Sequence, residues 1–263
     1  MKAGSGTDEA KLAAGEAAAA TVEDGMVVGL GTGSTTAYAI RALGEAVADG
    51  LSIRGVVTSV ATERLAREVG IPLTTLAAVD GIDVAIDGAD QVAFGESVDD
   101  NDQPSGESAD DDEPIDPLSG PCTLIKGGGG AHVREKLVAG AASRFLVVVD
   151  ETKVTDVLDW PVPVAVLQGA ETPVAGAIRD AGGEATLREA AEKDGPVVTD
   201  DGHFVLDCEF GPIESPETLA DRLSTIPGVV DHGLFVGMAD AVYVGTEADV
   251  EVYDCERDAG GTR

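Results

Sequence analysis

Positively charged residues are scarce in this chain of 263 residues. Lysine and arginine together number 17 against 49 aspartates and glutamates, which gives a formal net charge of −32. Nucleic acids and anionic membranes are bound through positive surface, so the sequence argues against both as partners. The acids are spread along the whole chain, and their repulsion is screened at molar salt, where the Debye length is about 3 Å. This pattern favours a halophile's surface over the alternative, an ordinary acidic protein with a charged tail.

Cysteines and long apolar runs are scarce as well. Cys122, Cys208 and Cys255 form no C-x-x-C pair and have no metal-ligand spacing with a histidine. We therefore expect no disulfide framework, no metal site and a cytoplasmic location. No apolar run reaches the roughly 18–20 residues that cross a bilayer, and the first ten residues lack the apolar core of a signal peptide.

Strands and helices alternate along the first part of the chain. Short apolar runs separated by amphipathic helices predict a mostly parallel sheet with helices on both faces, a Rossmann-like α/β architecture. We expect the strands at 25–30, 52–59, 81–87, 122–126 and 144–150, and a helix at about 131–142.

A second, smaller unit is expected from residue 159 to 237. Its pattern is β-α-β-β-α-β, with the two middle strands placed at 195–210 around an Asp-Gly turn, which suggests a ferredoxin-like α+β domain. Residues 240–246 predict a last strand that returns to the large sheet. The catalytic domain is then 1–158 with 238–263, and 159–237 is the small domain.

One acidic segment, 95–121, is rich in Ser, Pro and Asp and nearly free of large apolar residues. This composition predicts a solvated, mobile loop inserted in the first domain. A metal site built from its carboxylates is an alternative, but nothing in the segment fixes such ligands in space.

Four polar segments each follow a predicted strand. They are GTGSTT (31–36), DGAD (87–90), KGGGG (126–130) and DETK (150–153). The carboxyl ends of parallel strands share one edge of a sheet, and ligands of open α/β sheets bind there. The four segments together therefore predict a binding site at this edge.

The GTGSTT segment has the character of a phosphate cradle. Its glycines allow a sharp turn, its hydroxyls can donate, and the following helix directs free N–H groups at the loop. A Walker loop would need a lysine, and a dinucleotide fingerprint would need glycine where Thr36 stands. We therefore expect a small phosphate ester, the alternative being a glycine-rich turn without a ligand.

Glu135 is the candidate general base. Val133, Leu137, Val138 and Ala141 form the expected buried arc of its helix, and Glu135 falls at the margin of that arc. Partial burial raises the pKa of a carboxyl, which suits a base, whereas a plain surface glutamate is the alternative. The four glycines before it are either a slack linker or a place where a ligand approaches the backbone closely, and their position at the sheet edge favours the second.

The four segments, in this order and continuing into IPGVVDHGLF and VYVGT, resemble the ribose-5-phosphate isomerase type A family from about residue 8 to 247. The resemblance implies interconversion of ribose 5-phosphate and ribulose 5-phosphate, in the non-oxidative pentose phosphate pathway, without metal or organic cofactor. It also implies a homodimer or homotetramer and, with the composition, a haloarchaeal source. The implied catalytic residues are Glu135, Asp87, Asp90 and Lys126. The implied substrate-binding residues are Thr32, Gly33, Ser34, Thr35, Asp87, Gly88, Ala89, Asp90, Lys126, Gly127, Gly128, Gly129 and Lys153.

Two features depart from the family pattern. The 95–121 insertion replaces a short hairpin, and His132 stands where an aliphatic residue is expected.

A sugar-phosphate sensor domain is the main alternative function, although no basic DNA-binding helix pair is visible. An acyl-CoA transferase would need a nucleophilic glutamate in its own motif. A sugar-phosphate deaminase would need a catalytic histidine, and His132 alone is near the edge.

Overall fold

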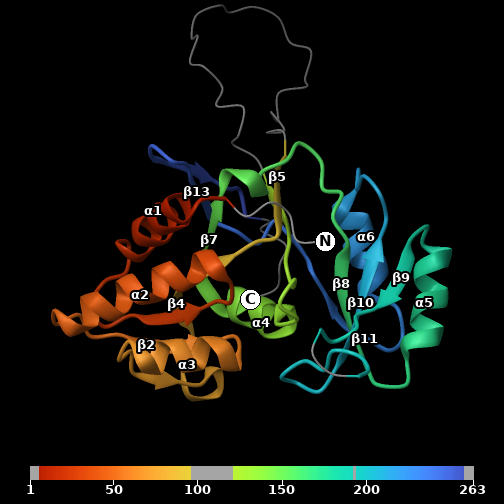
Figure 1. Ribbon diagram of the computed structural model, residues 1–263, viewed down its shortest axis with the longest axis horizontal. Helices are drawn as coiled ribbons and strands as arrows, with labels where there is room; N and C mark the ends of the chain where they lie inside the picture. The colour runs from red at the N-terminus through yellow and green to blue at the C-terminus, as the bar shows by residue number, and fades with distance from the viewer. Residues whose placement is uncertain (1–5, 96–120, 192–193, 258–263) are drawn as a thin grey trace, which may run out of the picture.

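The main sheet of the protein has seven strands and is almost entirely parallel. The computed structural model describes residues 6–95, 121–191 and 194–257. The strand order is β14-β13-β7-β4-β1-β2-β3, and only the β13–β14 pair is antiparallel. Figure 1 labels β13, β7, β4 and β2 of this sheet. The strands are β1 (Val27–Leu30), β2 (Arg54–Val57), β3 (Leu73–Thr74), β4 (Ile82–Gly88), β7 (Ala142–Asp150), β13 (Ala241–Gly245) and β14 (Val250–Asp254). The expected Rossmann-like sheet is confirmed.

Both faces of this sheet are covered, which explains why its central strands are nearly continuous apolar runs. The first face packs against α1 (Asp8–Ala19), α2 (Ser34–Ala48) and α3 (Val60–Glu68). The second face packs against α4 (His132–Ala141) and a three-stranded sheet of order β12-β6-β5. That sheet consists of β5 (Gln91–Phe94), β6 (Cys122–Ile125) and β12 (Leu234–Val236). Two short 3-10 helices, η1 (Leu76–Ala78) and η2 (Glu151–Lys153), complete this part.

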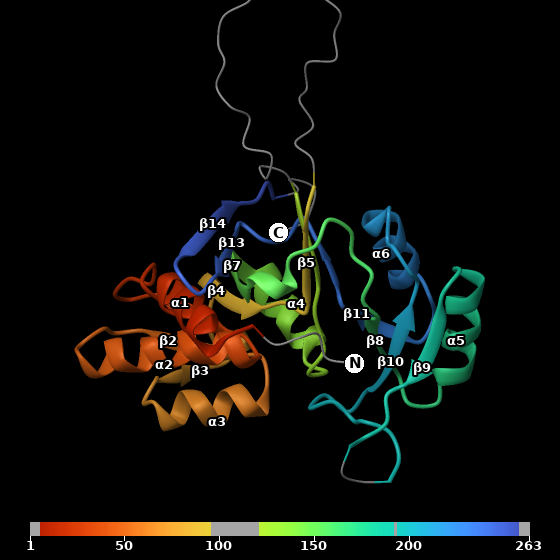
Figure 2. The ribbon, with the colours of Figure 1, turned by 45° about the horizontal axis from the view of Figure 1, so that its top comes forward.

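A second unit has the expected ferredoxin-like arrangement. Its four antiparallel strands have the order β11-β8-β10-β9 and share one apolar core with two helices. The elements are β8 (Val162–Val166), α5 (Glu171–Asp180), β9 (Glu184–Leu187), β10 (Phe204–Glu209), α6 (Pro216–Ser224) and β11 (Val229–His232). The unit lies beside the main sheet with α4 between them (Figures 1 and 2). The exact division of the chain at 159 and 237 stays a prediction, since β12 pairs with β6.

One expected strand position differs from the structure, and one strand is additional. On the side away from β8, β10 pairs with β9, which ends at Leu187, and not with the apolar stretch after Gly195. In that stretch Pro196 makes only an isolated bridge to Glu189. Proline has no N–H with which to extend a strand pairing, so the stretch at Pro196 does not form a strand. β9 alternates between half-buried and exposed residues, so the apolar pattern of β9 in the sequence is weak. The strand at 241–245 does return to the main sheet, but β14 follows it as an additional edge strand.

The expectation of no disulfide framework needs correction at one pair of cysteines. Cys122 at the start of β6 and Cys255 just after β14 are disulfide-bonded, with their Cα atoms 5.5 Å apart. The two cysteines are 133 residues apart in sequence. Only the fold brings β14 against the β5–β6 hairpin, where the rings of Phe94 and Tyr253 also meet at 4.8 Å. Cys208 is buried and free, as the sequence allowed.

Two sequence expectations concern membranes and the acidic segment. Among the helices of the described residues, none has the length and apolar character to cross a membrane. The predicted loop at 95–121 and its alternative metal site fall almost wholly outside the described residues.

Candidate active site

The site lies where the main sheet changes winding direction. β1 is flanked by β2 on one side and by β4 on the other, so the loop after β1 and the end of β4 are neighbours. The Thr32 N–H donates to Asp87 Oδ1 at 2.9 Å, and the Gly31 N–H donates to the carbonyl of Ile86 at 2.9 Å. Such a switch point is the usual ligand position of an open α/β sheet, so two of the predicted segments are brought together there.

A group of hydroxyls surrounds Thr32 in the cradle. Its Oγ1 lies 2.8 Å from Thr58 Oγ1 and from Ser59 Oγ, and 3.1 Å from Thr62 Oγ1. The sequence reasoning missed these three residues; the polar run TSVAT directly after β2 was the available signal. Thr58 and Thr62 donate to the carbonyls of Leu30 and Gly31. The network thereby fixes Thr32 and Ser59, which line a neighbouring cavity.

The first turn of α2 adds free backbone donors to this cradle. Gly33, with φ 142°, precedes the helix, and no side chain caps it. The backbone N–H groups of Ser34 and Thr35, at the start of α2, therefore face the cradle. The positive end of the helix dipole points the same way. Thr36 is fully buried beside them, and its hydroxyl has no partner among the described residues.

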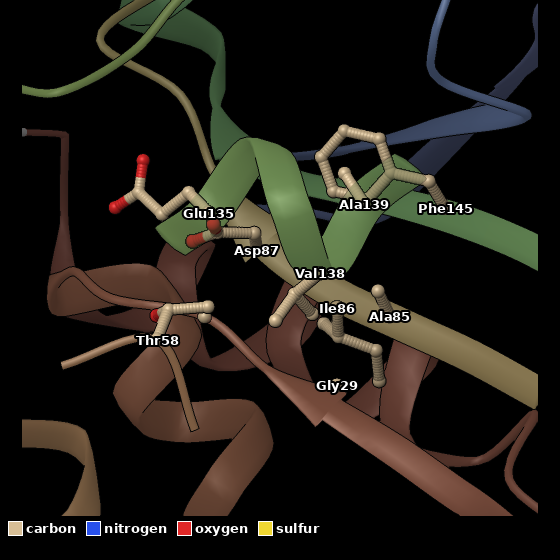
Figure 3. A pocket seen from close by; sticks show the side chains of 10 residues that line it. Gly29, Thr58, Ala85, Ile86, Asp87, Glu135, Val138, Ala139 and Phe145 are labelled. Carbon is tan, nitrogen blue, oxygen red and sulfur yellow. The ribbon is translucent and has the colours of Figure 1, made fainter. Parts of the chain in front are cut away.

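Three buried charges form the centre of the site. The Lys126 ammonium, 2% exposed, lies 3.0 Å from Asp87 Oδ2 and 3.2 Å from Glu135 Oε2, and it also donates to the Gly88 carbonyl. β6 ends directly before Lys126, β4 contains Asp87, and the first turn of α4 carries Glu135. Figure 3 shows Glu135 directly above Asp87, with Val138 of the same helix turned toward the sheet. Thus one cation separates two carboxylates that are shielded from water.

Burial controls the protonation of this cluster. It raises the pKa of Glu135 to about 8, an effect increased by the charge of Asp87 and opposed by the Lys126 ammonium. Burial also raises the pKa of Asp87, against the influence of Lys126. For Lys126, burial alone would lower the pKa, but the charges of Asp87 and Glu135 outweigh it and raise the pKa above the ordinary lysine value. The lysine stays charged while Glu135 can exchange a proton near neutral pH.

The glycine run is an ordered turn beside Asp90. Gly127 has φ +97°, a conformation that favours glycine, and the Gly130 N–H donates to the Gly127 carbonyl at 2.9 Å. The Gly128 N–H donates to Asp90 Oδ2 at 2.7 Å. A slack linker would have no such fixed contacts, so the interpretation of a close backbone approach is favoured.

The side chain of His132 packs against this turn at Gly127. Its side chain is fully buried, and neither ring nitrogen has a hydrogen-bond partner among the described residues. A Cβ atom on Gly127 would lie 2.6 Å from His132 Nδ1, so the ring fills the space that only glycine leaves. Burial, followed by the charges of Lys136 and Arg188, lowers the pKa of His132 to about 3. A neutral, enclosed imidazole does not suit the catalytic histidine of a deaminase.

A cavity of about 170 Å³ opens between the cradle and the glycine turn. Residues of both units line it, and the sequence reasoning missed the contribution of the second unit, Val197 to Asp200. The lining residues are Thr32, Ser59, Ala61, Gly129, Gly130, Ala131, Val197, Val198, Thr199 and Asp200. The segment from the second unit is fixed by Asp200, which accepts from the Val60 N–H at 2.9 Å, and by Asp201, which accepts from Arg134 Nε at 2.7 Å.

Two further residues differ from expectation. Leu137, expected in the buried arc of α4, is 57% exposed, because the helix turns Glu135, Val138 and Ala139 inward instead. The Lys153 ammonium lies 5.3 Å from the centre of the Trp160 ring, and no contact in the described residues joins it to the cradle. Its role in substrate binding stays a prediction.

A family model described as ribose 5-phosphate isomerase A (phosphoriboisomerase A) matches residues 54–97 and 110–249 of the chain. The chain belongs to the ribose 5-phosphate isomerase A family. A ribose-5-phosphate isomerase A from Halorubrum lacusprofundi is 57% identical over 96% of this chain and 99% of its own length. The one from Haloarcula marismortui is 53% identical over 96% of this chain and 98% of its own length. These relatives agree with the halophilic character of the composition.

Solved structures of the same family share the fold. A ribose 5-phosphate isomerase A from Methanocaldococcus jannaschii superposes with a TM-score of 0.81 at 38% identity, over 94% of this chain and 99% of that one. A second D-ribose-5-phosphate isomerase, solved in complex with phospho-erythronic acid, gives a TM-score of 0.80 at 40% identity, over 94% of this chain and 98% of that one. Both neighbours confirm the mixed α/β architecture.

Proposed function

We propose that this isomerase-family protein interconverts D-ribose 5-phosphate and D-ribulose 5-phosphate, with Glu135 as the general base. The observation that carries the proposal is the buried cluster in which the Lys126 ammonium lies 3.0 Å from Asp87 and 3.2 Å from Glu135. An aldose–ketose isomerisation moves a proton between neighbouring carbons through an enediolate. It needs a base with a pKa near neutral and a fixed positive charge for the developing oxyanion, and the cluster supplies both.

The steps follow from the positions of these groups. Glu135 takes the proton from C2 of the open sugar and returns it to C1 on the same face. Lys126 and a glycine-turn N–H that is not already bonded, such as that of Gly129, stabilise the enediolate oxygen. Asp87 and Asp90 bind hydroxyls, assist ring opening and move protons among the hydroxyl groups.

The phosphate is placed in the cradle of Thr32 to Thr35, together with the hydroxyls of Thr58 and Ser59. Holding this remote group positions the reacting carbons against Glu135 and lowers the entropic part of the barrier. Phospho-erythronic acid, which accompanies the related solved structure, carries both a phosphate and a carboxylate. A molecule of that charge pattern fits a site with an anion cradle at one end and Lys126 near the other. Lys153 is proposed to assist at the phosphate end.

One assay tests this function against the sensor alternative. The protein is incubated with ribose 5-phosphate in molar KCl, and ribulose 5-phosphate is measured; unphosphorylated ribose serves as the control substrate. We expect rapid conversion of the phosphate ester and poor conversion of ribose, since the cradle would be empty. Binding of ribose 5-phosphate by the folded protein without any ketose product would contradict the proposal and favour a sensor.

The pH dependence of activity follows from Glu135. A general base must be deprotonated in the free enzyme, and burial raises the pKa of this carboxyl to about 8. We therefore expect kcat/KM to be low in mild acid, to rise with pH, and to level off above the pKa of Glu135. The measurement is kcat/KM between about pH 6 and 10 in molar KCl. A profile that is flat from mild acid to neutral pH would be inconsistent with this base.

Gly128 offers a sharp test of the glycine turn. A Cβ at this position would lie 2.6 Å from Asp90 Oδ1, so Gly128→Ala should displace that carboxylate and the turn. We expect kcat to fall by about 10²-fold, the size of effect that a misplacement of about 1 Å can have.

The matched control is Gly140→Ala in α4, where a Cβ would meet no atom within 4 Å. It should keep full activity and gain about 0.5–1 kcal/mol in stability, because alanine is the better helix former. Equal activity of Gly128→Ala and Gly140→Ala would indicate that the glycine run is only a spacer.

The proposal also includes the cellular location and the oligomeric state of the enzyme. The substrates are charged and are formed inside cells, so we place the enzyme in the cytoplasm. The resemblance to the family supports a homodimer or homotetramer, which light scattering on the protein in molar KCl can test; a monomer at working concentration would contradict it.

A further inference from the structure

One arginine of the second unit binds the glycine turn directly. Arg188 follows β9, and its side chain is 17% exposed. Its Nη1 donates to the carbonyls of Gly127 at 3.0 Å and Gly128 at 3.1 Å. The opposite edge of the guanidinium pairs with Asp207 on β10, through Nε at 2.9 Å and through Nη2. The planar group is therefore held by a carboxylate on one side and holds two backbone carbonyls on the other.

Peptide geometry transmits this contact to the active site. In a planar trans peptide the C=O and the N–H point in opposite directions. The Gly127 carbonyl and the Gly128 N–H belong to one peptide, and that N–H donates to Asp90 Oδ2 at 2.7 Å. This peptide is thus held on both sides, by Arg188 and by Asp90.

The next peptide is held on one side only. Its carbonyl, that of Gly128, accepts from Arg188, so its N–H, that of Gly129, points the opposite way. Gly129 lines the cavity that Thr32 and Ser59 also line. No hydrogen bond of the Gly129 N–H is seen among the described residues, so this donor is available to a ligand in that cavity.

Glycines need such an external contact more than other residues do. With no side chain, each has the largest backbone freedom and adopts a single conformation only when neighbours fix it. His132 packs below Gly127, but it makes no hydrogen bond to the turn. Among the described side chains, the one that donates to the carbonyls of the turn is Arg188.

We propose that Arg188 is a positioning residue for the isomerisation: from the second unit, it orients the Gly127–Gly129 peptides so that the Gly128 N–H holds Asp90 and the Gly129 N–H faces the reacting sugar. This inference rests on the proposed isomerase function for its catalytic consequence. The geometry of the clamp itself can be tested without activity.

The kinetic test compares Arg188→Met with Arg222→Met. Arg222, on α6, also donates to a backbone carbonyl of the second unit, that of Asp180, and no hydrogen bond in the described residues joins it to the glycine turn. We expect Arg188→Met to lower kcat by about 10- to 100-fold with little change in KM, since the phosphate cradle is untouched. Arg222→Met should retain the wild-type kcat. Inhibition by inorganic phosphate should be the same in all three proteins, which shows that the cradle remains folded.

A double variant separates positioning from general structural damage. If Arg188 acts through the Gly128 peptide, the effects of Arg188→Met and Gly128→Ala on kcat should be far from multiplicative, because each already disturbs the same turn. Independent, multiplicative effects would overturn the proposal. Arg188→Lys should recover only a small part of kcat, because an ammonium cannot join Asp207 and two carbonyls in one plane.

Amide hydrogen exchange provides the test that does not depend on turnover. In protein labelled with ¹⁵N-glycine, we expect the Gly128 amide to exchange at least about 10-fold faster in Arg188→Met than in wild type or in Arg222→Met, since its bond to Asp90 loses its fixed geometry. Unchanged exchange of Gly128 would overturn the clamp, whatever the kinetics. Faster exchange in a protein that lacks isomerase activity would instead confirm the clamp and reject the proposed function.

Discussion

Replacing Glu135 by glutamine is expected to lower kcat by about 10²–10⁴-fold, the range that a well-placed general base contributes. The amide has the shape of the carboxylate but cannot accept the C2 proton. Among the described residues, the ion pair of Glu135 is with Lys126, and no hydrogen bond joins it to the phosphate cradle. KM should therefore change little, and the loss should appear in kcat. The measurement is steady-state kinetics with ribose 5-phosphate in molar KCl.

The control for this variant is Glu63→Gln, which removes only an exposed ion pair with Arg67 on α3. Exposed pairs contribute little, so this variant should match the wild type in both activity and unfolding. Near-normal turnover of Glu135→Gln would contradict the proposal that Glu135 is the general base.

Lys126→Met should have the second large effect, on both activity and stability. Removing the ammonium takes away the charge that we propose stabilises the enediolate, which should cost about 10²–10³-fold in kcat. It also leaves the buried carboxylates of Asp87 and Glu135 without their cation. Breaking a buried pair in this way typically destabilises a protein by about 3–5 kcal/mol.

The stability loss should depend on pH with a definite sign. Without Lys126 the folded-state pKa values of Asp87 and Glu135 rise further, so the variant is favoured where both are protonated and loses stability as pH rises through those values. Denaturant unfolding in mild acid and in mild base should therefore show the larger difference from wild type in base. An equal difference at both pH values would contradict the buried-cluster account.

Lys136→Met is the matched control for Lys126. Both ammonium groups lie over the Phe235 ring, at 4.9 Å for Lys136 and 5.4 Å for Lys126. Lys136, however, pairs with Asp231 at 2.7 Å and not with Asp87 or Glu135. Its replacement should lower stability and leave kcat nearly unchanged.

Much of the site could be predicted from the sequence because it is built from local segments. Asp87 and the cradle follow apolar strands whose parallel order is set by the alternation of strands and helices. The spacing from Lys126 to Glu135 is one turn of glycines and the start of a helix, so both reach the same edge. The raised pKa of Glu135 follows from its place on the inner side of α4, although the buried arc itself was misplaced at Leu137.

The remaining parts depend on long-range contacts that a local pattern does not contain. Arg188 reaches Gly127 from 61 residues away, and its charge looks the same in sequence as that of any exposed arginine. The hydroxyls of Thr58 and Ser59 become part of the cradle only because β2 pairs with β1. The disulfide joins residues that meet only after β14 has added to the far edge of the sheet, and spacing rules for cysteines do not reveal such a pair.

Hydrogen exchange at the substrate tests the role of Glu135 most directly, because it reports proton abstraction itself. Ribose 5-phosphate is equilibrated with the enzyme in D₂O with molar KCl, and deuterium at C1 of ribulose 5-phosphate and C2 of ribose 5-phosphate is followed by NMR. We expect wild type to incorporate solvent deuterium at both carbons over repeated turnovers, and Glu135→Gln at equal concentration to incorporate none in the same time. Exchange by Glu135→Gln at the wild-type rate would contradict the account.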